Sequence, residues 1–474
     1  MQQILVRWYD EALKRKSQFL SELQQFLRIE SVYNNSESRA MAPFGLGIAQ
    51  ALEHMLMLGE RDGFITKNVD GYAGHIEMGD GEELIGVLGH VDVVSPGNTE
   101  WTSPPFAPEI RDGKLYARGA IDDKGPMMAA YFAMKIIKEL NLPVHKRVRL
   151  IIGTDEEHQW RCVNHYFQHE EMPTMGFTPD ADFPIIIGEK GLLSLTFTGQ
   201  IKEIHSKEST WRLEEFSAGQ ESNKVPDLAI AKIEGDGDVF IVKELFQSFL
   251  LEHQTHGYAE EMDTGLQLVL HGVAHHAFEP NRGLNAALLL SKFLQQLSLD
   301  FQGSQYIEMF NQYFTDSFFG EKLGIAVTEE VLGSFTINVG ICRYRQDGES
   351  SLTMNCRYPM GVNPDGLKER IAERLASYQL KLTNVEHLPL HYVNQEHELV
   401  QKLAHVYEEQ MQQPAQLLTT GGATYARAIE VGVAFGPLFP GRLETAHQHD
   451  EHVEIDDLIR AIALYTQAIY ELAK

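Results

Sequence analysis

Cysteine is scarce in this chain. Three cysteines, at positions 162, 342 and 356, occur among 474 residues. They form no CxxC pair and no disulfide framework, so the chain does not read as a disulfide-stapled secreted domain. A reducing cytoplasm is the simplest compartment. Cys162 has no evident base in the sequence, and we expect a packed core thiol in preference to a nucleophile.

Long apolar runs and positive charge are scarce as well. No uninterrupted apolar stretch approaches the ~20 residues of a membrane span. The first 27 residues read as an amphipathic helix and not as a signal peptide. Lys and Arg number 40 against 67 Asp and Glu, which gives a formal net charge of −27. This balance argues against nucleic acids and anionic membranes as partners.

The composition is that of a globular protein, with 43% hydrophobic residues. A chain of this length exceeds one ordinary core, so two domains are expected. In its first part, buried apolar runs alternate with helical segments. Examples are "EELIGVLGHVDVV", "GPMMAAYFAMKIIKEL", "RVRLIIGTDEE" and "FPIIIGEKG". This alternation predicts an α/β layer with a parallel or mixed sheet.

The pattern changes near Gly191. Segments such as "GLLSLTFTGQ" and "SLTMNCRYP" alternate with period two, as half-solvated strands do, and helices such as "GLNAALLLSKFLQQL" lie between them. We therefore expect an α+β domain over residues 192–384. It would be inserted into an α/β domain made of residues 1–191 and 385–474.

The first buried run ends in two polar residues, His90 and Asp92. Their side chains lie on the same side of an extended chain. A metal-bound imidazole usually gives its other N–H to a carboxylate, so Asp92 could orient His90 in this way. Taken alone, the pair reads equally well as a polar cap on a core strand.

Four further polar clusters follow along the chain. Each has an ordinary interpretation, either as a helix N-terminal cap or as a solvated acidic loop. Five clusters at the ends of apolar elements are harder to explain separately, because strand ends are where α/β sheets build their sites. Carboxylates and imidazoles without thiolates suit a pair of zinc, cobalt or manganese ions. The four clusters are "AIDDKG", "TDEEH", "PDADF" and "ETAHQHDEH".

The order of these motifs resembles the dinuclear zinc aminoacylase/carboxypeptidase family of metallopeptidases. The strings "PDADFPIIIGEKG", "SNKVPD", "GVAHHAFEPNRGLNA" and "TTGGATYAR" resemble more closely its bacterial dipeptidase branch. That branch includes the Xaa-His (carnosinase-like) dipeptidases of lactic bacteria. The resemblance covers nearly the whole chain. It implies a mixed-sheet zinc-peptidase domain with an inserted α+β lid, a small peptide as substrate, and two divalent ions, Zn²⁺ before Mn²⁺ or Co²⁺.

The resemblance also implies roles around the metals. Glu156 would be the general base, and Asp92 would support His90. Among the late histidines, His447 matches the family's position, in preference to His449 and His452. The implied ligands are His90 and Asp180 for one ion, Glu157 and His447 for the other, and Asp122 as the bridge. The peptide bond between Asp122 and Asp123 is expected to be cis, as in the family.

In the inserted domain, the resemblance implies contacts to the substrate. His276 would donate to the oxyanion, whereas the neighbouring His275 falls one place early. Arg357 would hold the C-terminal carboxylate, although without the family it would read as a surface ion pair. The remaining implied contacts are Asn223, Gly421 and Gly422. The long insertion also implies a monomer in which His276 acts within its own chain.

One pair of residues departs from the family pattern. His158 and Gln159 follow the paired glutamates, where the family usually has Ser or Thr and then Gly. His158 could narrow the site, add a metal contact or pack under the following helix, and we expect packing. The preferred function is a metal-dependent dipeptidase. The alternatives are an N-acyl-amino-acid amidohydrolase of the same family and a catalytically silent binding protein.

Overall fold

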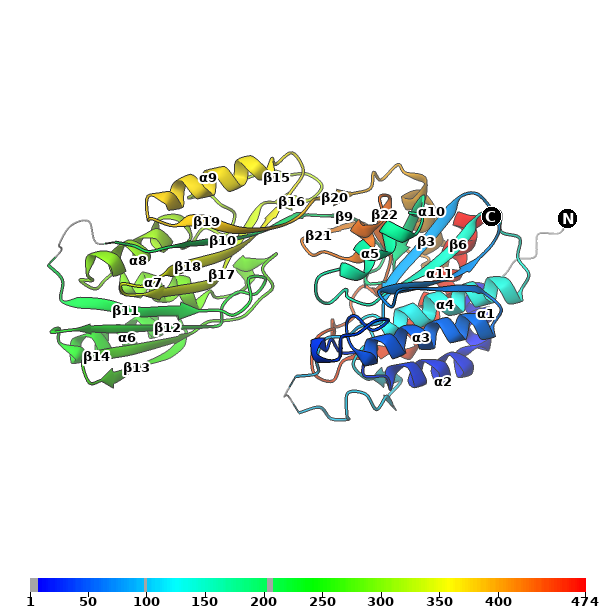
Figure 1. Ribbon diagram of the computed structural model, residues 1–474, viewed down its shortest axis with the longest axis horizontal. Coiled ribbons are helices and arrows are strands. Elements are labelled where there is room, and N and C mark those ends of the chain that lie inside the picture. Colours follow the sequence, from blue (N-terminus) through cyan, green and yellow to red (C-terminus); the bar gives the residue numbers. More distant parts are fainter. Residues whose placement is uncertain (1–6, 98–99, 203–207) are drawn as a thin grey trace. The chain divides into compact units, whose positions relative to one another are not determined.

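The computed structural model describes residues 7–97, 100–202 and 208–474 (Figure 1). The chain divides into two compact units. The second unit extends past the expected insertion of residues 192–384 at both ends and also includes Thr420–Gly422. The first unit comprises residues 1–188, 392–419 and 423–474, and the second comprises residues 189–391 and 420–422.

The first unit is built on a mixed nine-stranded sheet, as the alternation of strands and helices predicts. Strands β6, β3, β7 and β22 run parallel to one another, and antiparallel strands flank them. The order is β1 (Ile65–Val69), β2 (Ala73–Met78), β6 (Arg147–Gly153), β3 (Leu84–His90), β7 (Met175–Thr178), β22 (Gly432–Ala434), β9 (Ile185–Glu189) and β20 (His391–Tyr392), with β21 (Leu417–Thr420) beside β9.

Strand β3 is buried on both faces because helices cover both sides of the sheet. Val87 belongs to the core that contains the apolar residues of α4 and α11, whereas Leu88 packs with Cys162 and Tyr166 on the α5 side. The helices of this unit are α1 (Trp8–Lys14), α2 (Lys16–Leu27), α3 (Leu46–Arg61), α4 (Lys124–Glu139), α5 (Arg161–His169), α10 (Glu398–Met411) and α11 (Ile455–Ala473).

The N-terminal segment forms two helices where one was expected. The break falls at Arg15, and α1 contacts α11 whereas α2 contacts α4. Residues 1–6 of the expected helix lie outside the described residues. Short elements complete this unit: β4 (Glu109–Arg111), β5 (Lys114–Tyr116), β8 (Ala181–Asp182), β23 (Pro437–Leu438), β24 (His452–Glu454), η1 (Asn35–Glu37) and η3 (Tyr425–Ala428).

The second unit is an antiparallel eight-stranded sheet with helices packed on it, which is the expected α+β pattern. Its strand order is β13 (His256–Met262), β14 (Gly265–His271), β12 (Leu228–Gly235), β11 (Trp211–Ala218), β17 (Thr336–Arg345), β18 (Ser350–Tyr358), β10 (Gly191–Gly199) and β19 (Lys381–Leu388). The other elements are α6 (Val239–Glu252), α7 (Ala286–Leu294), α8 (Phe301–Tyr313), α9 (Pro364–Ala376), η2 (Pro280–Arg282), β15 (Thr328–Glu329) and β16 (Gly333–Ser334).

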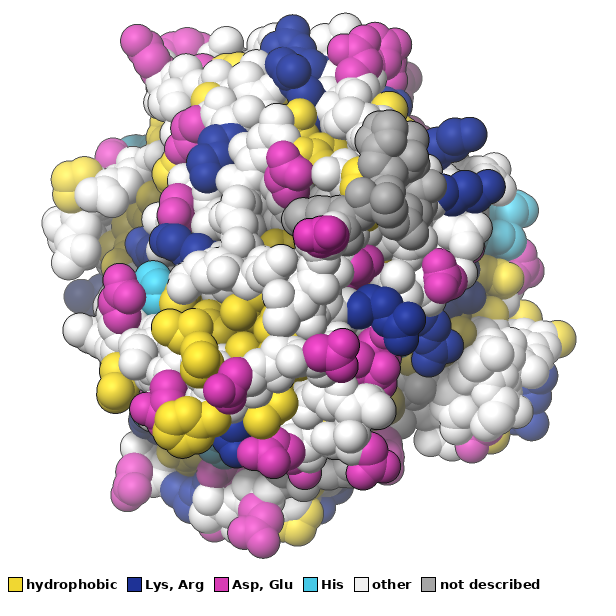
Figure 2. Space-filling view, turned by 90° about the vertical axis from the view of Figure 1, so that its left-hand side faces the viewer, with side chains coloured by type: hydrophobic (Ala, Val, Ile, Leu, Met, Phe, Trp, Pro, Cys, Tyr) yellow, Lys and Arg dark blue, Asp and Glu magenta, His cyan; other side chains and the backbone are white. Residues whose placement is uncertain are grey.

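The surface and the cysteines agree with the composition. Figure 2 shows acidic and hydrophobic side chains side by side on the face turned to the viewer, without one dominant basic surface there.

All three cysteines are buried and free. Cys162 lies in the core with its Sγ 2.8 Å from the Tyr425 hydroxyl, and burial raises its thiol pKa to about 12. The expectation of a core thiol is confirmed. Among the described residues, no helix is both long and apolar enough to cross a membrane.

Candidate metal centre and active site

The buried strand β3 delivers His90 to the carboxyl end of the parallel strands. The imidazole is fully buried, and its Nδ1 donates to the main-chain oxygen of Asp92 at 2.9 Å. The backbone N–H of His90 donates to the Asp123 carboxylate at 3.0 Å. The ring edge of His90 meets Tyr425 at a centroid distance of 6.1 Å. These contacts fix the ring and leave Nε2 as its ligand atom.

Asp122 lies between two histidines that are far apart in the sequence. Its Oδ1 is 3.1 Å from His90 Nε2, and its Oδ2 is 2.9 Å from His447 Nε2. The peptide bond between Asp122 and Asp123 is cis, as predicted. One carboxylate therefore contacts an imidazole through each of its two oxygens.

Two further carboxylates complete two adjoining clusters. Asp180 Oδ2 lies 3.7 Å from His90 Nε2, and Glu157 Oε1 lies 3.0 Å from His447 Nε2. In each cluster the potential ligand atoms lie within 4.8 Å of one another. The clusters are His90, Asp122 and Asp180, and Asp122, Glu157 and His447. The structure thus brings together all five residues that the sequence predicted as ligands.

Charge in this region is strongly unbalanced. Burial raises the pKa of Glu156 well above its usual range, and the carboxylates of Asp180 and Glu157 add to the shift, against the opposing imidazole of His90. Burial and the neighbouring Asp122 carboxylate raise the pKa of Asp180 to about 7. Burial opposes protonation of His447, but its two carboxylate neighbours outweigh that effect and raise its pKa to about 11. Carboxylates packed this closely repel one another when ionised, and a bound cation would offset that repulsion.

The residues present fit a pair of divalent ions. Four carboxylates, those of Asp122, Glu156, Glu157 and Asp180, influence one another's pKa here, and two divalent ions carry the matching positive charge. Within the described residues, the buried Nε2 of His90 has no hydrogen-bond partner of good geometry, although the Asp122 carboxylate lies 3.1 Å from it. A buried ring nitrogen without such a partner is a suitable metal ligand. Nitrogen and oxygen donors without sulfur suit zinc, manganese or cobalt.

Asp92 supports His90 in a different way from the one expected. The imidazole donates to the main-chain carbonyl of Asp92, while the side-chain Oδ1 lies farther away, at 3.5 Å. The other carboxylate oxygen accepts the backbone N–H of Glu157 at 3.1 Å. Asp92 therefore touches one residue of each cluster.

A buried ion pair that the sequence motifs did not predict lies behind Asp122. Glu451 accepts from the backbone N–H groups of Ile121 and Asp122, at 3.0 and 3.3 Å, and from Arg118 Nη1 at 2.6 Å. Both charged side chains are almost fully buried. The only sequence signal was the position of Glu451 in the "HQHDEH" cluster, since Arg118 lies 333 residues away along the chain.

Asp123 is not the helix cap that was considered for it. It precedes α4, yet its side chain makes no capping hydrogen bond. Its buried carboxyl instead accepts the backbone N–H of His90, and burial raises its pKa well above the usual value. A side chain at Gly89 would collide with this carboxyl group, so the close approach requires glycine there.

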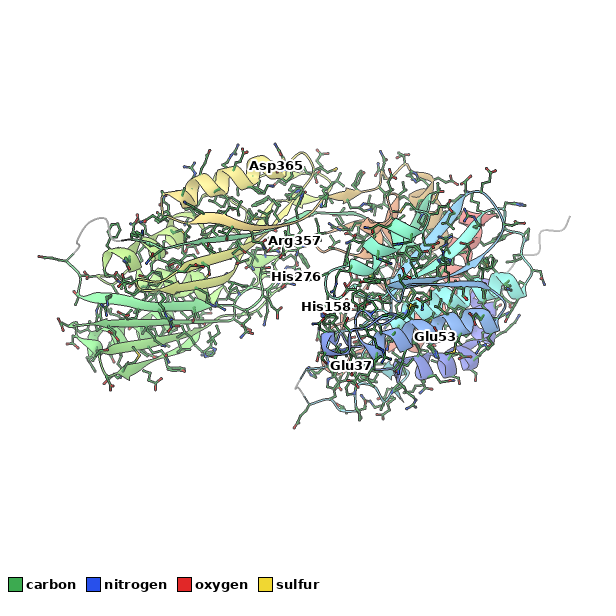
Figure 3. The ribbon with its side chains drawn as sticks, viewed as in Figure 1. Glu37, Glu53, His158, His276, Arg357 and Asp365 are labelled. Carbon is green, nitrogen blue, oxygen red and sulfur yellow. The ribbon has the colours of Figure 1, made fainter. Side chains whose placement is uncertain are left out.

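The late histidines differ in their surroundings. Of these histidines, His447 belongs to the cluster with Asp122 and Glu157, whereas the His452 ring lies tilted against Tyr116 at a centroid distance of 4.7 Å. His158 does not pack under α5, so that expectation is wrong. The residue is exposed in the turn before the helix (Figure 3), and its ring lies 4.3 Å from that of Tyr33.

The residues predicted to contact the substrate are linked within the second unit. Arg357 is buried and donates from Nη1 to the main-chain oxygen of Gly421 at 2.7 Å. A side chain on Gly421 would collide with Phe278, whose ring lies 4.6 Å from that of His276. Figure 3 shows His276 and Arg357 at the same end of this unit.

Two more predicted residues belong to this group. The main-chain oxygen of Asn223 accepts the N–H of Ala277 at 2.8 Å, which joins the Asn223 loop to the His276 loop. Gly422 donates its backbone N–H to Thr420 Oγ1 at 2.9 Å. His276 and Asn223 are both exposed. A flat arginine, two glycines and exposed polar side chains at one end of a sheet can bind a small polar molecule.

Comparisons with known proteins agree with this architecture. The pattern of "Peptidase family M20/M25/M40" matches residues 86–471. The protein named "Putative dipeptidase YtjP" from Bacillus subtilis (strain 168) is 47% identical over 471 residues, which cover 99% of this chain and 100% of that protein.

Two solved structures show the same fold at low sequence identity. Human carnosine dipeptidase 1 matches with a TM-score of 0.58 and 13% identity, over 98% of each chain. The aminoacylhistidine dipeptidase from Vibrio alginolyticus matches with a TM-score of 0.57 and 13% identity, over 96% of this chain and 97% of that chain.

Proposed function

The chain belongs to peptidase family M20/M25/M40, and from that premise we propose that it is a metal-dependent dipeptidase. It would hydrolyse the peptide bond of dipeptides that have a free C-terminal carboxylate. One observation carries this proposal: the Asp122 carboxylate lies between His90 and His447, at 3.1 and 2.9 Å. The name of the relative at 47% identity supports the same activity.

Two divalent ions would be held by the five clustered side chains. Asp122 would bridge them, because each of its oxygens already faces a different imidazole. When bound, such a pair supplies a water of lowered pKa and polarises the scissile carbonyl. The ligands would be His90 and Asp180 on one side and Glu157 and His447 on the other. Zinc is the first choice among the metals that suit this donor set.

Glu156 would be the general base. It stands next to Glu157 but is not one of the clustered ligand residues, and its pKa responds to the charges of His90 and Asp180. Its carboxylate would accept a proton from the attacking water and then donate that proton to the leaving amine. Asp92 would hold His90 and the Glu157 backbone in place during this transfer.

The second unit would bind the substrate. His276 would donate a hydrogen bond to the developing oxyanion. Arg357 would hold the C-terminal carboxylate, since its planar guanidinium suits a carboxylate. Asn223, Gly421 and Gly422 would supply further polar and main-chain contacts. If the carboxylate and the scissile carbonyl are both held, their separation limits the substrate to a dipeptide.

A substrate panel tests this proposal. Purified enzyme with zinc, manganese or cobalt is offered dipeptides, tripeptides, N-acyl amino acids and dipeptides with an amidated C-terminus. We expect hydrolysis of free dipeptides and little hydrolysis of the amidated ones. A charge-assisted contact of the Arg357 kind is worth about ten- to a hundredfold in binding. Preferred cleavage of N-acyl amino acids would establish the amidohydrolase alternative instead.

We further propose that the enzyme works as a cytoplasmic monomer. The second unit spans about two hundred residues of one chain, 189–391, and it carries its own His276. Mixing inactive His276→Ala with inactive Glu156→Ala tests whether sites are shared between chains. Absence of activity in the mixture is expected, and restored activity would contradict the proposal.

A further inference from the structure

A third cluster of potential ligands lies in the first unit and shares no residue with the two clusters around Asp122. His165 and His169 are four residues apart on α5, so their side chains project from the same face of the helix. Asp70 belongs to the turn between β1 and β2. One ligand atom from each of these residues lies within 4.8 Å of the other two.

Neighbouring groups orient the two imidazoles. His165 Nε2 lies 3.0 Å from Asp70 Oδ2, and the Tyr72 ring stacks on His165 at 4.2 Å with an interplanar angle of 22°. His169 Nδ1 lies 2.9 Å from the main-chain oxygen of His165. A carbonyl oxygen only accepts, so this Nδ1 carries a proton and Nε2 would be the ligand atom of the neutral imidazole. This hydrogen bond to a backbone carbonyl is the usual support of a metal-binding histidine.

The spacing is close to that of a coordinated ion. Two ligands at about 2.1 Å from a tetrahedral zinc ion are about 3.4 Å apart. In the structure His165 Nε2 and Asp70 Oδ2 are 3.0 Å apart, and the three ligand atoms all lie within 4.8 Å of one another. Asp70 and His169 are exposed and can rotate towards the partly buried His165. The proton between His165 and Asp70 would be released when the ion binds.

We propose that Asp70, His165 and His169 form a third divalent-metal site, separate from the catalytic pair. Two imidazoles and one carboxylate suit zinc, with water in the open position. The ion would join the β1–β2 turn to α5. Tyr72 of that turn accepts a hydrogen bond through its main-chain oxygen from Thr154, and α5 follows the turn that carries Glu156. The site would therefore connect the β1–β2 turn and α5, the two segments next to the turn that carries Glu156.

Zinc counting tests the proposal without reference to catalysis. The parent chain and His165→Gln/His169→Gln are dialysed against zinc supplied in slight molar excess over the sites, and bound zinc per chain is measured. We expect the double variant to bind one ion fewer than the parent. Equal counts would overturn the proposal, whatever number the parent itself binds. Because only the difference between the two chains is used, the result does not depend on whether the parent binds the proposed catalytic pair of ions.

A matched control and a second variant complete the experiment. His405 is another exposed helical histidine with a carboxylate, Glu409, at 3.8 Å but belongs to no ligand cluster in the described part of the chain. His405→Gln should leave the zinc count unchanged. His169→Gln alone changes only an exposed side chain, so it covers the case in which the double variant does not fold. It should weaken binding of the third ion, and unchanged binding would exclude His169 as a ligand.

Hydrogen exchange gives an independent readout. Zinc should slow amide exchange in the β1–β2 turn and in α5 of the parent, because the ion links these segments. The same addition should have no such effect on His169→Gln. Equal protection of both chains by zinc would contradict a bridging ion at Asp70, His165 and His169.

Discussion

The carboxylate of Asp92 accepts the backbone N–H of Glu157 at 3.1 Å, while the main-chain carbonyl of the same Asp92 accepts from His90 at 2.9 Å. One residue thus positions members of both ligand clusters. Asp92→Ala should lower metal affinity and turnover about ten- to a hundredfold, the usual cost of losing a group that supports a metal ligand. Metal titration and steady-state kinetics measure both effects.

Asp92→Asn is the matched control for that prediction. Its amide oxygen can still accept the Glu157 N–H, and the main-chain carbonyl is unchanged. It should therefore retain more activity than Asp92→Ala. If both variants were equally impaired, the negative charge of Asp92, and not its acceptor position, would explain the effect.

The buried pair of Glu451 and Arg118 leads to a second prediction. Glu451→Ala leaves the Arg118 charge buried without its carboxylate and removes the acceptor of the Ile121 and Asp122 N–H groups. Breaking a buried ion pair in this way costs about 3–5 kcal/mol. Glu451→Gln keeps a hydrogen-bond acceptor and should lose less. Denaturant unfolding of the metal-free chains measures the difference, and equal stability of the Ala variant and the parent would contradict it.

Acid stability provides a third prediction. His75 is buried against the Tyr166 hydroxyl, and burial together with the nearby Arg149 charge lowers its pKa from 6.5 to about 4. Below pH 6.5 the unfolded chain binds a proton here that the folded chain does not. Stability should therefore fall as the pH decreases from about 6.5 to about 4, by about 3 kcal/mol from this residue.

His75→Gln tests that contribution because glutamine can still bond Tyr166 but does not titrate. Unfolding of both metal-free chains is measured across this pH range. The variant should lose about 3 kcal/mol less than the parent over the interval. Identical pH profiles would show that His75 does not contribute to acid destabilisation.

His158 provides a fourth prediction. It is exposed, its ring lies tilted against that of Tyr33, and it belongs to neither cluster around Asp122. His158→Ser restores a residue usual in the family. Its kcat/KM should stay within about twofold of the parent value, as for most surface changes. Loss of a bound ion in this variant would instead identify His158 as a ligand.

Much of the fold was predictable because hydrophobic periodicity follows the burial of each face. Strand β3 reads as fully apolar because helices cover both of its faces. The apolar and polar residues of "SLTMNCRYP" alternate along β18, a strand of the antiparallel sheet, although the second half of this strand is buried on both faces. The N-terminal helix was predicted without its break at Arg15. That break depends on which helices α1 and α2 contact, and periodicity along one segment contains no such information.

The candidate site also contains contacts that the sequence predicted and contacts that it did not. The order of the motifs was sufficient to predict that Asp122 and His447 lie close together, because the resemblance to a known family includes contacts between segments that are far apart in the sequence. The sequence did not predict that Arg118 pairs with Glu451. Both side chains are buried here, and nothing in the residue types arginine and glutamate indicates burial. The packing of His158 was also wrong: α5 begins only at Arg161, so His158 lies in the exposed turn before the helix.

The most direct test of the dinuclear mechanism compares two neighbouring glutamates. Metal content and turnover are measured for Glu156→Ala and Glu157→Ala, both in the His165→Gln/His169→Gln background so that an ion at the third site is not counted. Glu156→Ala should keep two ions and lose turnover, because it removes the base and no ligand. Glu157→Ala should retain one ion and lose most activity. Full turnover in Glu156→Ala, or two tightly bound ions in Glu157→Ala, would contradict the roles proposed for these two residues.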